Sequence, residues 1–123
     1  MKKNELDKLR KMLREAKIPF ETFQESMDCM DEKRRKVAMR LYGEAYLWKR
    51  NQIVYGRHFG GKRYDWLFDG VCQYASYGAK IGMIEAWGDM GEDEHHYPRT
   101  MTAKEAFEII SDDWEKRKKK EQI

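Results

Sequence analysis

The chain has 123 residues, enough for one sizeable core, so we expect a single domain over 1–123. Hydrophobic residues make up 41% and charged residues 38%, and charges interrupt every apolar run, which argues against a membrane span. The formal net charge of +3 equals that of the segment Glu115–Glu121, so the near-neutral remainder gives no global sign of nucleic-acid binding.

The first predicted element is a helix that begins after Asn4, a suitable N-cap. Its apolar residues recur at spacings of three and four, which predicts one face against the core: Leu6, Leu9, Leu13 and Ala16. Pro19 ends this helix because it lacks an amide hydrogen and restricts Ile18 to extended geometry. The next segment, 20–26, is interpreted as a short strand, with a helical turn as the alternative.

A second helix is predicted over 31–42, with Asp31 as its cap. Its apolar side, opposite a cationic side, is formed by Val37, Ala38, Leu41, Tyr42 and Ala45. Gly43 weakens its continuation. The segment 44–48 is therefore a candidate first arm of a hairpin that turns at 49–51 and returns as 52–56.

Three further segments have the β-branched and aromatic composition of strands: 52–56, 63–74 and 80–87. In the middle one, Phe68 and Cys72 share one parity and Val71 the other, which indicates a bulge at 69–70. The strand residues expected in the core are Trp66, Phe68, Val71, Cys72, Met83 and Ile84.

Residues 88–98 read as an acidic exposed loop, and Thr102 with Glu105 forms the capping-box pattern that begins the last helix. That helix has an apolar stripe, and 114–123 is its basic end or a tail. The predicted fold class is α+β: a three- to four-stranded antiparallel sheet with N-terminal and C-terminal helices packed on it.

Two groups of residues have metal-binding or nucleophilic chemistry. The loop 89–96 contains four acidic residues, His95 and His96, but adjacent histidines point in different directions, and we expect neither a metal nor a cofactor. Cys72 and His58 form the only candidate pair of nucleophile and base. The cysteines lack CxxC spacing, so Cys29 and Cys72 are interpreted as reduced thiols and Cys72 as a core residue.

Nucleotide binding is the chemistry that the residues favour. Tyrosine rings offer faces to a purine, and arginine or lysine side chains offer charge to phosphate. The predicted ligand-binding set lies on neighbouring loops: Arg57, Gln73, Tyr74, Ser76, Tyr77, Lys80 and Arg99. The alternative is that the tyrosines are rim residues and that Lys80 protects a strand edge.

Four short motifs occur in order over the C-terminal half. They are Asp69 with Val71–Cys72, then 76–78 (SYG), then 82–85 (GMIE), then the start of the last helix, 102–107. In this pattern the chain resembles small, largely uncharacterised proteins encoded by phages and prophages of Gram-positive bacteria. The resemblance implies phage origin and a role in countering host defence, and it points to no catalytic residue.

Three functional hypotheses follow. The first is a non-enzymatic phage protein that sequesters a small nucleotide signal of a bacterial immune system. The second is a protein–protein inhibitor of a host defence protein, such as an anti-CRISPR protein, that acts through the acidic loop 89–94 and exposed aromatic residues as a partial nucleic-acid mimic. The third is a small metal-dependent nuclease or phosphodiesterase that uses the 89–96 loop. For the first we expect a homo-oligomer in the host cytoplasm, since small folds build deep pockets more readily between subunits.

Overall fold

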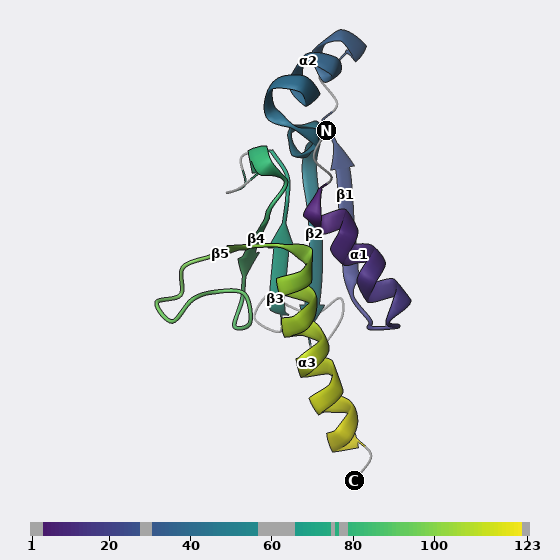
Figure 1. Cartoon of the computed structure of the whole chain (residues 1–123), viewed down its shortest axis with the longest axis vertical. Helices are drawn as coiled ribbons and strands as arrows, with labels where there is room; N and C mark the ends of the chain where they lie inside the picture. The colour runs from purple at the N-terminus through teal and green to yellow at the C-terminus, as the bar shows by residue number, and fades with distance from the viewer. Residues whose placement is uncertain (1–3, 28–30, 57–65, 75, 77–78, 122–123) are drawn as a thin grey trace.

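The computed structural model describes residues 4–27, 31–56, 66–74, 76 and 79–121 (Figure 1). Its elements, in chain order, are helix α1 (Glu5–Glu15), strand β1 (Glu21–Ser26), helix α2 (Glu32–Tyr42), 3-10 helix η1 (Glu44–Leu47), strands β2 (Trp48–Gly56) and β3 (Trp66–Val71), 3-10 helix η3 (Ala79–Ile81), strands β4 (Ile84–Trp87) and β5 (Arg99–Met101), and helix α3 (Ala103–Glu121). The predicted α+β class is confirmed.

The strands form one antiparallel sheet in which each strand pairs with the next along the chain, in the order β1-β2-β3-β4-β5. Glu21 lies opposite Val54, Val54 opposite Asp69, and Asp69 opposite Trp87, so these residues share one face. Their neighbours in each strand point to the other face. The sheet has five strands instead of three or four because residues 99–101, which lie between the predicted loop 88–98 and the last helix, pair with β4.

Helices α1 and α3 lie on the same face of the sheet (Figure 1). Arg10 of α1 donates to Thr22 and Asn51 on β1 and β2, and the Tyr55 hydroxyl of β2 donates to Asp113 of α3 at 2.6 Å. The core fills the space between these helices and the sheet, and its large, fully buried apolar residues include Leu6, Leu9, Leu13, Ile53, Tyr55, Phe68, Ile84, Met101 and Ile110.

Local sequence signals explain the ends of both packed helices. The Asn4 side chain accepts from the Leu6 amide at 2.9 Å, which satisfies one of the free donors of the first turn of α1. Lys17, with a φ of 59°, turns the chain away before Pro19. At the start of α3, Thr102 and Glu105 form the predicted reciprocal bonds, with the Glu105 amide 3.2 Å from the Thr102 hydroxyl.

The region between α2 and β3 differs from the predicted hairpin. Residues 44–47 form η1, and the expected turn at 49–51 lies inside the nine-residue strand β2. The physical reason is that the polar side chains of Asn51 and Gln52 are buried and hydrogen-bonded, so polarity there does not indicate a turn. No helix within the described residues is long and apolar enough to cross a bilayer.

Two smaller expectations about the sheet are also wrong. The register between β2 and β3 runs without interruption past Asp69 and Gly70, and it shifts instead between Tyr55 and Gly56. Val71 therefore faces the side without helices and is only partly buried. The strand expected over 80–87 begins only at Ile84, because residues 79–81 form η3. Phe68, Cys72 and Ile84 are core residues as predicted, and Met83 is partly buried. The side chain of Trp66, also expected in the core, lies outside the described part of the chain.

Candidate functional site

The chain segment after β3 is held firmly against β2. The Gln73 side-chain oxygen accepts from the Asn51 amide at 2.8 Å, and the Tyr74 amide donates to the Trp48 carbonyl at 2.9 Å. The Ser76 hydroxyl accepts from the Gln73 amide at 3.0 Å and donates to the Gln73 carbonyl at 2.8 Å. Gln73 and Ser76, predicted to contact a ligand, thus use their polar atoms to fix this segment.

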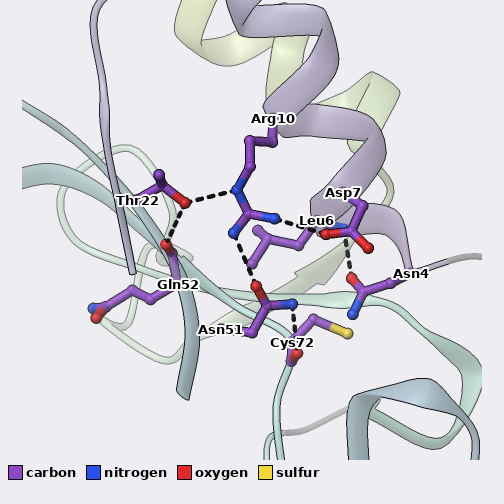
Figure 2. Close-up of polar contacts among 8 residues, drawn as sticks. All are labelled: Asn4, Leu6, Asp7, Arg10, Thr22, Asn51, Gln52 and Cys72. Carbon is purple, nitrogen blue, oxygen red and sulfur yellow. Dashed lines mark hydrogen bonds and ion pairs between the residues drawn. The ribbon is translucent and has the colours of Figure 1, made fainter. Parts of the chain in front are cut away.

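A buried polar network leads from α1 to Cys72, at the start of this segment (Figure 2). The Arg10 guanidinium, 4% exposed, donates to Asp7 at 2.6 Å, Thr22 at 2.6 Å and Asn51 at 2.8 Å. Asn51, fully buried, donates in turn to the Cys72 carbonyl at 3.1 Å. Since every nitrogen of the guanidinium has an acceptor, the network is a structural link between α1, β1, β2 and the end of β3.

Burial shifts the pKa values of two titratable groups beside this network. Burial raises the pKa of the Cys72 thiol to about 12, and the negative charges of Asp7, Glu44 and Glu5 add to the rise. The thiol is fully buried and stays protonated, which is unsuitable for a nucleophile. Burial, followed by repulsion from Asp7, also raises the pKa of the Glu44 carboxyl. His58, the candidate base, lies outside the described residues.

The remaining predicted ligand residues are dispersed or undescribed. Arg57 and Tyr77 lie outside the described residues, and of Lys80 only the backbone, in η3, is described. Tyr74 is 53% exposed, with its ring edge-on to Tyr46 at a centroid distance of 5.6 Å. Arg99 is exposed on β5, opposite Ala86 and level with Gly70, two strands away from β3. The register does not bring Arg99 beside Tyr74.

The acidic loop is organised by its own backbone. The Asp93 side chain accepts from the amides of His95 and Tyr97 at 2.8 and 3.1 Å, and His96 has a φ of 65°. The two imidazoles lie near different carboxylates, His95 at 3.5 Å from Glu94 and His96 at 3.6 Å from Glu92. Within the ranges that the structure describes, no three His, Cys, Asp or Glu side chains are grouped to hold a metal ion.

Helix α2 projects beyond the ends of the strands at the end of the molecule that also carries η1 and η3 (Figure 1). It forms because the Asp31 side chain caps the Arg34 amide at 2.8 Å, and it ends at Gly43, whose φ of 92° suits glycine. Of its apolar side, Ala38 is buried, whereas Val37 is 39% and Leu41 51% exposed. A groove of about 460 Å³ runs along it, lined by Asp31, Lys33, Arg34, Val37 and Ala38.

Among the described residues, four of the five large exposed apolar side chains belong to α2, η3 and the segment after β3. Val37 and Leu41 on α2, Tyr74 after β3 and Ile81 in η3 are each 39% to 53% exposed. Residues 31–42 contain five basic and two acidic side chains, so Val37 and Leu41 lie on a helix with a net positive charge. We use the name apical surface for the exposed residues at this end of the molecule: Val37, Leu41, Tyr74 and Ile81 with the basic residues 33–36.

The amphipathic pattern of 31–42 identified the apolar residues of α2, but it did not show that two of them stay uncovered. Ile81 was expected inside a strand, and its exposure follows from the 3-10 turn of η3. Comparison of the chain with protein-family models, with curated proteins and with solved structures gave no match.

Proposed function

We propose that the protein is a non-enzymatic inhibitor that binds an acidic protein partner through the apical surface. The observation that carries the proposal is the pair of exposed apolar side chains, Val37 and Leu41, on a helix that projects beyond the strands and carries a net positive charge. Exposed apolar patches of this kind mark interaction sites, and burial of each large side chain contributes about 2 kcal/mol.

The composition of the apical surface favours a protein over a nucleic acid. Aliphatic side chains such as Val37, Leu41 and Ile81 gain nothing from contact with a phosphate backbone, whereas they are buried at the centre of protein interfaces. The basic residues 33–36 form a flank, which suits an acidic rim on the partner and speeds association. The anchored segment after β3 fixes Tyr74 in place, so little conformational entropy is lost on binding.

The resemblance to phage proteins suggests the class of partner: a protein of the bacterial defence system. An inhibitor of this kind acts by occupying a surface that its target needs, and it requires neither a catalytic residue nor a cofactor. This role corresponds to the second hypothesis from the sequence, with α2 and its neighbours as the contact surface in place of the acidic loop.

The proposal is tested by affinity capture from host lysate with three matched baits: the wild type, Val37→Glu with Leu41→Glu, and Tyr97→Glu. The first variant places two negative charges in the apical surface, and the second places one negative charge at a 67% exposed residue of the acidic loop. We expect one stoichiometric acidic partner with the wild type and with Tyr97→Glu, and its loss with the double variant. Absence of a stoichiometric partner, or its retention by the double variant, contradicts the proposal.

Nucleotide sequestration remains a second candidate because of Tyr74. Its exposed ring, held edge-on by Tyr46, offers a face on which a base can stack. Thermal-shift assays with a panel of cyclic nucleotides and cyclic ADP-ribose isomers test it. Stabilisation that Tyr74→Phe keeps and Tyr74→Ala abolishes supports this candidate, and no shift across the panel removes it.

A further inference from the structure

A second groove lies on the opposite side of the fold from α2, between α3 and the loop that follows β4. It has a volume of about 560 Å³ and is lined by Met90, Glu108, Ile109, Asp112, Asp113 and Lys116. Its apolar floor consists of Met90 and Ile109, which pack on the core with one side and line the groove with the other. The α3 positions that line it are four residues apart, so they form one continuous face of the helix.

The charges of α3 are segregated along its length. Residues 103–113 contain four acidic side chains and one basic side chain, and residues 114–121 contain five basic and two acidic ones. The two halves therefore carry −3 and +3. This order also suits the helix dipole. The dipole does not account for the apolar groove beside the acidic half of α3. This groove is open, and a further helix can fill it.

We propose that this face pairs with α3 of a second copy of the chain, in antiparallel orientation. A two-fold axis places the acidic half of each helix against the basic half of the other, and the same surface then serves both copies. The C-terminal turns of α3 extend past the ends of the strands, which leaves them accessible to a second molecule (Figure 1). The apical surface lies at the other end of the molecule and stays free for its partner.

The axis lies near position 114, which sets Asp112 of one copy opposite Lys116 of the second copy. Within one chain these two side chains form an ion pair at 3.1 Å, and they are 70% and 71% exposed. Exposed pairs contribute little alone. In the dimer the two Asp112 and two Lys116 side chains form a four-membered network over the buried Met90 and Ile109, which adds apolar burial to the charge complementarity.

The test measures mass in solution by sedimentation for the wild type, Asp112→Lys, Lys116→Asp and an equimolar mixture of both variants. We expect a wild-type dimer of about twice the 14.9 kDa chain mass and loss of the dimer in each single variant. The mixture is expected to restore a 1:1 heterodimer, because the two lysines at 112 and 116 of one variant then meet the two aspartates at these positions of the other. Both variants break the same intrachain pair, so an effect on the helix alone cannot restore association.

Lys118→Asp is the matched control, since it reverses a charge on the same helix and breaks the 3.2 Å pair with Glu115 outside the groove. It is expected to stay dimeric, and circular dichroism verifies the helix content of each variant. A wild-type chain that is monomeric at about 100 µM overturns the proposal, as does a mixture that contains only monomers. Either result leaves the proposed apical partner untouched, because that partner binds through different residues.

Discussion

Replacement of Arg10 by Met tests whether the buried network holds α1 to the sheet. Methionine keeps much of the apolar stem and removes only the guanidinium. Arg10 is 4% exposed and its three acceptors belong to α1, β1 and β2. Burial lowers the pKa of Arg10, while the Asp7 charge opposes that shift, so the charged form is retained at a cost that its hydrogen bonds must offset.

The acceptors are affected unequally. Asp7 is 44% exposed and Thr22 is also exposed, so water replaces Arg10 there at little cost. Asn51 is fully buried, and its side-chain oxygen is left without a donor, which costs about 1 to 3 kcal/mol. Loss of the hydrogen bonds to Asp7 and Thr22 adds a smaller cost. We therefore expect Arg10→Met to lower the free energy of unfolding by about 2 to 3 kcal/mol, a large part of an ordinary domain's stability.

Urea denaturation followed by circular dichroism measures this change, with Lys11→Met, an exposed neighbour on α1, as the control. Adding Asn51→Ala to Arg10→Met should cost less than the sum of the single changes, since the two side chains bond to each other. If Arg10→Met is as stable as the wild type, or more stable, the guanidinium is a net burden and the reasoning is refuted.

Three further predictions concern burial elsewhere. In a Cys29→Ser background, Cys72 should react with a thiol reagent at least about a hundredfold more slowly in the native protein than in urea. The reason is that its thiol is buried and has a pKa of about 12, and equal rates would contradict this burial. Glu44→Gln should raise the melting temperature at pH 7, because burial and Asp7 raise the folded-state pKa of Glu44 and thus penalise its ionised form. This advantage should be lost as the pH falls from the raised folded-state pKa to the ordinary pKa of glutamate, and a constant difference across pH would refute this. Gly91→Ala should destabilise by about 1 to 3 kcal/mol, since its Cβ would lie 2.5 Å from the Trp87 carbonyl oxygen; an unchanged urea midpoint would show that the loop adjusts freely.

The sequence predicted best those elements whose signals are local. The Asn4 cap and the Thr102–Glu105 capping box both occur as expected, because capping depends on residues two or three positions apart. It predicted β2 poorly. Asn51 can be buried because it forms hydrogen bonds with Arg10, 41 positions away, and with Gln73, 22 positions away. Neither contact is visible in a local sequence pattern.

The candidate site shows the same limit. The pattern of 31–42 shows that α2 has an apolar side, but coverage of that side depends on where the helix lies relative to the sheet. Although both residues lie on the same helix, which projects past the strands, Ala38 is buried and Leu41 is 51% exposed. Similarly, the polar groups of Gln73 and Ser76 suggested ligand contacts, and only the structure shows that they bond to each other and to Asn51.

The pairing of every strand with its neighbour in sequence has a consequence for folding kinetics. Each strand can be added next to the one that precedes it in sequence, so the entropy lost on closing each connecting loop is small. A more distant contact joins α1 to α3, where Glu5 accepts from the Ala103 amide at 3.1 Å across 98 positions. If this contact forms last, its loss leaves the folding rate nearly unchanged and accelerates unfolding, so α1–α3 docking determines how long the native state survives.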